Sequence, residues 1–297
     1  MKRIILYLTT VFTLTYLYEY VCVVRFLAAH KEYTIAAIPV NLAVAMFIPA
    51  FSVLFVRLFT KEGLSGHYIN FDLKNGKYKY YLLAWFLPAV LTLLGAALYF
   101  ICYKGDFSKD MDFIIATYAK QGVTGITPDA MMKTAISQGI TAILIGPVIN
   151  CITTFGEEWG WRGYLLPKLS EKLTGLPLML VMGVIWGLWH LPLTVCGHNY
   201  GTQYPGYPFL GIAAMVLFCF SIGTFLSYVT LKTGSCVPAI IGHGAINSFA
   251  SIGIYFTKDG GRLLFGPAPT GVIAGIPCLV TAIILIRLMK KDDEKEK

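Results

Sequence analysis

The feature that most constrains this chain is a series of long apolar runs that carry almost no charge. A helix needs about 20 apolar residues to cross the hydrocarbon core of a bilayer. Eight stretches approach or exceed that length, near residues 4–29, 34–59, 80–103, 138–166, 176–196, 207–231, 236–256 and 270–289. The runs are continuous, whereas strands of a membrane barrel would alternate in short segments. The sequence therefore predicts an all-α, polytopic membrane helix bundle with about eight transmembrane helices, as a single integral membrane domain over residues 1–297.

Composition supports this class and excludes others. Charged residues make up 13% of the chain, about half of what a soluble domain carries. The net charge of +8 does not indicate nucleic-acid binding, because no basic helix face carries interleaved aromatic residues. The seven cysteines form no CxxC pair, so they are interpreted as small apolar packing residues. The expected surroundings are a lipid bilayer, with no nucleic acid as a partner.

The distribution of Lys and Arg predicts the orientation. Met1-Lys2-Arg3 resembles the start of a signal peptide, but the apolar run continues to about Ala29 without a small-residue cleavage site, so it is interpreted as a retained first span. With both termini cytoplasmic, 16 of the 24 basic residues lie inside and 8 outside, as the positive-inside rule expects. Residues 290–297 are then a charged cytoplasmic tail, and 104–137 is an outer loop whose four aspartates fit no calcium-binding spacing.

Ionisable groups inside the predicted spans are costly and indicate function. They are Glu19, Glu157, Glu158, His190 and His243, with Arg162 near a span end. Glu158 and Arg162 are four residues apart and can pair on one helix face. Glu157 points about 100° away from Glu158, so it can face a cavity. A structural ion pair with a second, interfacial glutamate is the alternative interpretation of this segment.

Two further spans carry a histidine beside small residues. His190 follows Gly183 and Gly187, whose spacing permits close helix approach. His243 shares a helix face with Asn247. Taken alone, His190 is better explained as a helix-to-helix hydrogen bond, and His243 is explained as well by polar helix packing as by a function. At 1.5 Å per residue, however, Glu157, His190 and His243 all lie roughly 10–20 Å from the cytoplasmic face, and groups of these types at one depth can bind and activate water.

Three motifs on these spans resemble the intramembrane proteases of the CAAX-protease and bacteriocin-processing group, also called the abortive-infection family, which includes type II CAAX prenyl endopeptidases. They read Glu157-Glu158-x-x-x-Arg162, Trp186-x-x-x-His190 and His243-x-x-x-Asn247. The order matches that of the family, and Trp186 stands where the family has Phe. The resemblance covers residues 138–256, which would be the catalytic core spans.

The resemblance implies an intramembrane endopeptidase that cuts a membrane-associated protein or peptide near the cytoplasmic face. Glu157 would activate the attacking water with help from His190, and His243 and Asn247 would hold the oxyanion. Glu158, Arg162 and Trp186 would support these groups. The chemistry agrees, since a partly desolvated carboxylate suits a general base and a carboxamide suits an oxyanion donor. Neither histidine has a Ser or Cys beside it in sequence, so a covalent nucleophile is not indicated.

The involvement of a metal stays open at this stage. His190, His243 and Glu157 would make the two-His, one-Glu set of a catalytic zinc site, yet the sequence contains no HExxH. No cofactor is firmly predicted, and zinc remains an alternative. If both histidines bound a metal, Glu158 or a water would have to supply the base.

Two other functions compete with proteolysis. A non-proteolytic membrane scaffold or regulator, of the kind that confers bacteriocin immunity, would keep the same fold without the chemistry. A transporter would line a path with polar groups, and Glu19 fits that idea, although the paired repeats of many transporters are not found. Glu19 could instead pair with Arg25 or border the cavity. The sequence does not choose the substrate, and prenylated CAAX proteins and bacteriocin leaders are both compatible with it.

Overall fold

The computed structural model describes residues 1–25, 34–63 and 65–295, and this part of the chain is helical without β-strands. The all-α prediction is therefore confirmed. Its elements are α1 (Lys2–Tyr18), η1 (Glu19–Arg25), α3 (Thr34–Phe59), α4 (Tyr78–Cys102), η3 (Lys104–Asp106), α5 (Asp112–Lys120), α6 (Pro128–Leu144), α7 (Gly146–Gly160), η4 (Trp161–Leu165), α8 (Leu166–Ser170), α9 (Gly175–Trp189), α10 (Leu191–Val195), α11 (Phe209–Thr233), α12 (Val237–Phe249), η5 (Ile252–Phe256) and α13 (Ile276–Lys295).

The predicted number of spans is not confirmed. Within the described residues, five helices are long and apolar enough to cross a membrane, or six if the bent pair α6 and α7 counts as one. One reason is the length of α9, which has 15 residues and therefore extends about 22 Å, less than the hydrocarbon thickness. The first predicted stretch is also only partly covered, because residues 26–33 lie outside the described part of the chain.

The expectation of one continuous span over residues 138–166 is wrong. The chain bends by 54° between α6 and α7–α8, and Pro147 lies in the first turn of α7. Proline has no backbone N–H, so it leaves the carbonyl four residues earlier without its helical donor. That carbonyl belongs to Ile143, and the indole Nε1 of Trp85 donates to it at 2.8 Å. A neighbouring helix thus satisfies the backbone group that the bend exposes.

The predicted span 176–196 is also interrupted at a proline, and another helix again satisfies the freed carbonyl. The helix α9 ends at Trp189, His190 follows as its C-cap, and the short α10 starts next with Pro192 in its first turn. The carbonyl freed by Pro192 is that of Leu188, which accepts from the hydroxyl of Tyr16 at 2.6 Å. The break places His190 at a helix end, where its side chain is not confined to the regular α9 surface.

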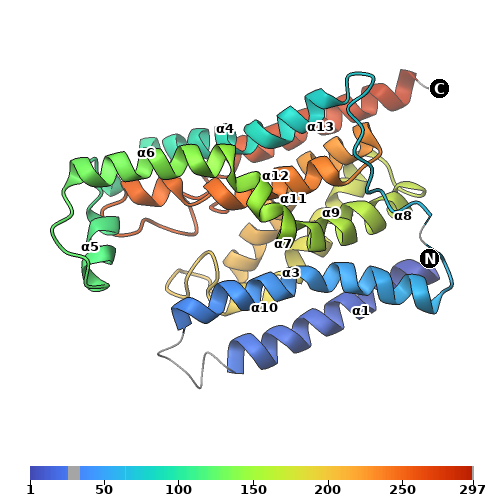
Figure 1. Ribbon diagram of the computed structural model, residues 1–297, viewed down its shortest axis with the longest axis horizontal. Coiled ribbons are helices and arrows are strands. Elements are labelled where there is room, and N and C mark those ends of the chain that lie inside the picture. Colours follow the sequence, from blue (N-terminus) through green and yellow to red (C-terminus); the bar gives the residue numbers. More distant parts are fainter. Residues whose placement is uncertain (26–33, 64, 296–297) are drawn as a thin grey trace.

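The helices that carry the three motifs pack closely at small residues. The helix α7 lies between α3 and α12, and α9 packs along α11 (Figure 1). A Cβ on Gly183 or Gly187 would collide with the backbone of α11, so the predicted close helix approach is confirmed for α9. Likewise, a Cβ on Gly156 would meet the backbone of α3, and one on Gly244 would meet α7. Each of these four glycines therefore lies where two helices are in close contact.

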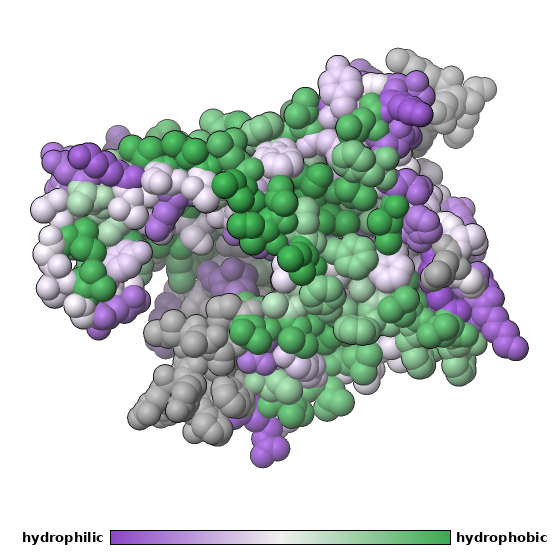
Figure 2. Space-filling view, viewed as in Figure 1, coloured by the Kyte–Doolittle hydropathy of each residue, from purple (hydrophilic) through white to green (hydrophobic). Residues whose placement is uncertain are grey.

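One face of the molecule is mostly apolar between two polar ends. Hydrophobic side chains cover most of the middle of this face, and hydrophilic ones gather at the two ends (Figure 2). The N-terminus and the end of α13 lie at the same end of the long axis (Figure 1). At that end Glu62 accepts from Lys168 at 2.5 Å and lies 3.7 Å from Arg3.

Two charged segments are more structured than expected. Of the predicted tail 290–297, residues through Lys295 continue α13, and 296–297 lie outside the described residues. The segment 104–137 contains η3, α5 and the start of α6. Within it, Asp106 accepts from the Tyr99 hydroxyl at 2.5 Å and pairs with Arg262 at 3.2 Å.

Candidate active site

The last turn of α7 carries the two adjacent glutamates, and both are buried. Glu158 pairs with Arg162 of η4 at 2.9 Å, with side chains 0% and 1% exposed, so the predicted i,i+4 ion pair is confirmed. The η4 segment is a π-turn, a form that often occurs at functional sites. Glu157 does not join this ion pair, because neighbouring residues of a helix point about 100° apart, as predicted.

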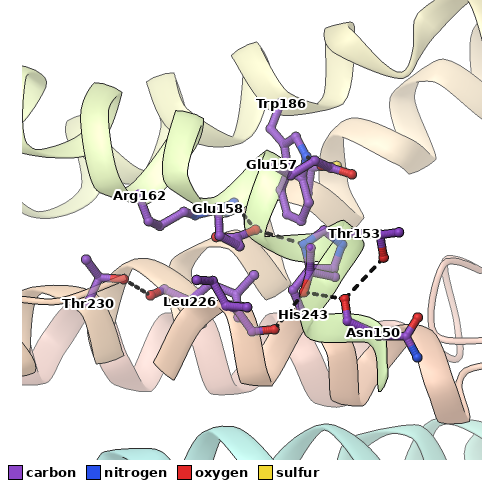
Figure 3. Close-up of polar contacts among 12 residues, drawn as sticks. Asn150, Thr153, Glu157, Glu158, Arg162, Trp186, Leu226, Thr230 and His243 are labelled. Carbon is purple, nitrogen blue, oxygen red and sulfur yellow. Dashed lines mark hydrogen bonds and ion pairs between the residues drawn. The ribbon is translucent and has the colours of Figure 1, made fainter. Parts of the chain in front are cut away.

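His243 on α12 joins the ion pair from the opposite side (Figure 3). Its Nδ1 lies 2.9 Å from the same Oε1 of Glu158 that Arg162 contacts. A carboxylate can only accept, so Nδ1 donates and Nε2 is left for another partner. Glu158 thus fixes the orientation of the imidazole and is held in turn by the guanidinium.

Glu157 is anchored through only one of its oxygens. The indole Nε1 of Trp186 donates to Oε2 at 2.8 Å, and Glu157 is 2% exposed. Its Oε1 has no hydrogen-bond partner among the described residues. One oxygen therefore holds the side chain in position, and the other is available to a water or a substrate.

His190 is oriented by the backbone of its own helix. Its Nδ1 lies 2.9 Å from the Trp186 carbonyl oxygen, which can only accept, so Nδ1 carries the proton. In the neutral ring Nε2 is then an acceptor. The Sγ of Cys219, on α11, lies 3.8 Å from the same Nδ1. Sequence reasoning missed this cysteine because it is 29 residues away, but the nitrogen that it approaches is already bonded to the Trp186 carbonyl oxygen.

Trp186 contacts every motif of the site. Its ring lies 5.7 Å from the His190 ring and 5.3 Å from the His243 ring, centroid to centroid. The Arg162 guanidinium stacks on its face at 4.3 Å, and its Nε1 holds Glu157. The sequence suggested only a supporting aromatic at this position. The structure makes it the common contact of the carboxylate, both imidazoles and the arginine.

Asn247 makes no hydrogen bond to this cluster within the described residues. It follows His243 by one turn of α12, and its side chain is exposed and makes no hydrogen bond within the described residues. A different asparagine, Asn150 on α7, joins the two helices by donating to Ser248 Oγ at 3.0 Å. Sequence reasoning missed Asn150, although a carboxamide two turns before Glu157 was a visible signal.

The alternative zinc ligands, His190, His243 and Glu157, do not fit a metal site in this geometry. Within the described part of the chain, no three His, Cys, Asp or Glu side chains converge in a way that could hold a metal ion. One oxygen of Glu157 accepts from Trp186, whose ring lies 5.7 Å from the His190 ring and 5.3 Å from the His243 ring, centroid to centroid.

The fold and the site define a class: a helical integral membrane protein with carboxylates and imidazoles buried together among its helices. Residues 139–249 match the family model described as type II CAAX prenyl endopeptidase Rce1-like. The resemblance drawn from the motifs is thereby confirmed, because this segment is similar to the Rce1-like domain of CAAX proteases. All the motif residues, from Glu157 to Asn247, lie within the matched segment.

Two curated proteins are similar over parts of the chain. CAAX prenyl protease 2 of Methanococcus maripaludis is 29% identical over 92 residues, which cover 31% of this chain and 34% of that protein. Lysostaphin resistance protein A of Staphylococcus haemolyticus is 25% identical over 157 residues, covering 52% of this chain and 39% of that protein. The matched segments thus span between a third and two fifths of the length of these relatives.

Proposed function

We propose that this protein is an intramembrane endopeptidase that hydrolyses a peptide bond of a membrane-associated protein or peptide. The observation that carries the proposal is the arrangement around Trp186, inside an apolar bundle. Within the described residues, one oxygen of Glu157 and the Nε2 atoms of His190 and His243 have no hydrogen-bond partner. Proteolysis needs a base for water and donors for the oxyanion. The match to an Rce1-like domain supports the same reaction class.

Glu157 and His190 are proposed to activate the attacking water. The free Oε1 of Glu157 accepts a proton from the water, while Trp186 holds Oε2 in place. The neutral His190 presents Nε2 as an acceptor, because its Nδ1 proton is engaged by the Trp186 carbonyl. Both acceptors are positioned by one residue, which favours a water shared between them.

His243 and Asn247 are proposed to stabilise the oxyanion. In its doubly protonated form His243 donates Nδ1–H to Glu158 and offers Nε2–H to the substrate oxygen. The carboxamide of Asn247 has no other partner within the described residues, so its N–H groups are available to the same oxygen. Glu158 and Arg162 act by holding His243, and they do not contact the substrate.

The site is proposed to lie in the cytoplasmic half of the membrane, with both termini cytoplasmic. The chain leaves the site through α8, where Lys168 meets Glu62 at the same end as Arg3 near the N-terminus. Basic residues gather at this end, as they do on the cytoplasmic side of membrane proteins. A substrate anchored in the inner leaflet would reach the site directly.

The test uses purified protein in phosphatidylcholine vesicles and an internally quenched, farnesylated peptide ending in a CAAX sequence. This probe follows from the name of the archaeal relative. We expect Glu157→Gln, His190→Ala and His243→Ala each to abolish cleavage while the protein stays folded. The control is Glu171→Gln, which removes an exposed carboxylate outside the site. Wild-type rates from all three site variants would refute the proposal.

A comparison of membrane peptides from cells with wild-type protein and with Glu157→Gln extends the test beyond prenylated substrates. Fragments that depend on Glu157 identify the natural substrate. A phenotype of the wild-type gene that persists unchanged in Glu157→Gln would favour the non-proteolytic scaffold.

A further inference from the structure

A buried carboxylate outside the three motifs has no partner within the described part of the chain. Glu19 begins the π-helical segment η1 directly after α1, and its side chain is 0% exposed. Among the described residues, neither of its carboxylate oxygens has a hydrogen-bond partner, and no ion pair joins it to Arg25, which is exposed. A carboxyl group inside a membrane bundle without a partner is costly, so its presence calls for a function.

Contacts on the preceding turn place Glu19 beside the end of α9. Thr15 Oγ accepts from the indole of Trp189 at 2.8 Å, and the Tyr16 hydroxyl donates to the Leu188 carbonyl at 2.6 Å. The ring of Trp189 packs on that of His190, with centroids 4.8 Å apart. Glu19 follows one turn later, where η1 contacts α10 and α3. The carboxyl group therefore lies next to the chain that leaves His190.

The same carboxyl group is within electrostatic range of Glu157. The charges of Glu19 and Glu157 act on one another, and α3, which contacts η1, touches α7 at Gly156 beside Glu157. The titratable groups that face Glu19 are Glu157 on α7, Tyr16 and Tyr18 on α1, and Cys196 beyond α10. Among the described residues, no cation faces it.

Two carboxylates in a low-dielectric site cannot both ionise without a cation, and one of them keeps a proton. Glu158 does not compete for this proton, because Arg162 neutralises its charge. Glu157 accepts the hydrogen bond of Trp186, which favours its ionised form. Glu19 has no such donor, so the proton belongs on Glu19.

We propose that Glu19 is a further catalytic residue, a protonated carboxyl group that gives its proton to the leaving amine. The proposal rests on the proposed protease function. Water attacks the carbonyl carbon and loses one proton to Glu157, and the C–N bond breaks as Glu19 protonates the nitrogen. Glu157 then returns its proton to Glu19 through water. The sum is one peptide bond and one water converted to one carboxylic acid and one amine.

The first test is independent of any substrate. Infrared spectra of the wild-type protein in vesicles at neutral pH should show the C=O stretch of a protonated, buried carboxyl group. We expect Glu19→Gln to remove this band and the control Glu171→Gln to leave it. A band of the same intensity in Glu19→Gln overturns the proposal, whether or not the protein is a protease.

The second test compares two leaving groups on the farnesylated peptide: the natural amide, and a p-nitrophenyl ester that leaves without protonation. We expect Glu19→Gln to lower kcat on the amide by about 10²–10⁴-fold, and to leave the ester rate unchanged. Glu157→Gln should abolish turnover of both, since both need the activated water. Equal losses on amide and ester in Glu19→Gln would indicate a structural role and overturn the proposal. Ester and amide rates that are insensitive to Glu157→Gln overturn the proposed protease function instead.

Discussion

Trp186→Phe tests whether the indole N–H positions Glu157, the proposed catalytic carboxylate. The substitution keeps an aromatic ring under the Arg162 guanidinium, which now stacks at 4.3 Å. It removes the 2.8 Å hydrogen bond to Glu157 Oε2. The perturbation is therefore close to the loss of one donor in a fully packed position, since Trp186 is 2% exposed.

The magnitude follows from the charge of the acceptor. A hydrogen bond to an ionised group contributes about 1.5–3 kcal/mol. If that amount is lost from the geometry of the transition state, the rate falls by about 10-fold to 150-fold, at about 1.4 kcal/mol for each factor of ten. We expect the loss in kcat, because a displaced base slows the proton transfer.

The chain offers a matched control on the same helix. Trp189 is also 2% exposed and also donates a 2.8 Å hydrogen bond, but to the neutral hydroxyl of Thr15. Trp189→Phe should cost about 0.5–1.5 kcal/mol of stability and leave kcat nearly unchanged. The assay measures cleavage of the farnesylated peptide together with thermal unfolding. Equal kcat values for both variants would refute the positioning role of Trp186.

Three further predictions concern the structure around the site. Arg162→Met removes the guanidinium that pairs with the buried Glu158 carboxylate and should cost about 3–5 kcal/mol of stability, measured by thermal unfolding, whereas Lys77→Met at the partly exposed pair should have no measurable effect. Pro147→Ala restores a helical donor, so the 54° bend should decrease and cleavage should fall without loss of stability. Partial burial raises the pKa of Glu62, but the hydrogen bonds from Lys168 and Tyr164 and the charges of Lys168 and Arg57 together lower it more, so the net pKa lies below 4.5. Its stabilising contribution is present above that value and is lost as the pH falls through the lowered pKa, so Lys168→Met should destabilise the protein at pH 7 and less in acid.

Each of these has a clear contrary result. Equal unfolding temperatures for Arg162→Met and wild type would mean that the buried ion pair does not stabilise the bundle. Full activity of Pro147→Ala would show that the bend is not needed to place Glu157. A destabilisation by Lys168→Met that grows as the pH falls would contradict the assigned ionisation of Glu62.

The polar groups inside the apolar runs could be recognised from the sequence, because the interior of a membrane tolerates few such groups. Charges inside apolar runs stand out, and the i,i+4 spacing of Glu158 and Arg162 predicts a pair that the structure contains at 2.9 Å. The three motifs also led to the family, which the match over residues 139–249 confirms. The helical class follows from hydropathy, and the motifs are recognised by the spacing of their residues. Both are local properties of the sequence.

The breaks in the helices depended on tertiary contacts. Proline within an apolar run can be absorbed as a gentle kink or can end the helix, and the sequence does not decide between these outcomes. Donors from other helices decided it, as Trp85 satisfies the Ile143 carbonyl and Tyr16 satisfies that of Leu188. This is why the spans predicted over 138–166 and 176–196 are divided.

The sequence alone determined a helical membrane protein with carboxylates and imidazoles inside its apolar runs, because burying charge in lipid is costly enough to leave a local signature. Only the tertiary structure decided which of these groups contact one another. It gave Trp186 the central place, joined His243 to Glu158, left the Asn247 side chain exposed and packed η1, which carries Glu19, against α3 and α10. These relations join residues far apart in sequence, and they depend on the packing of whole helices.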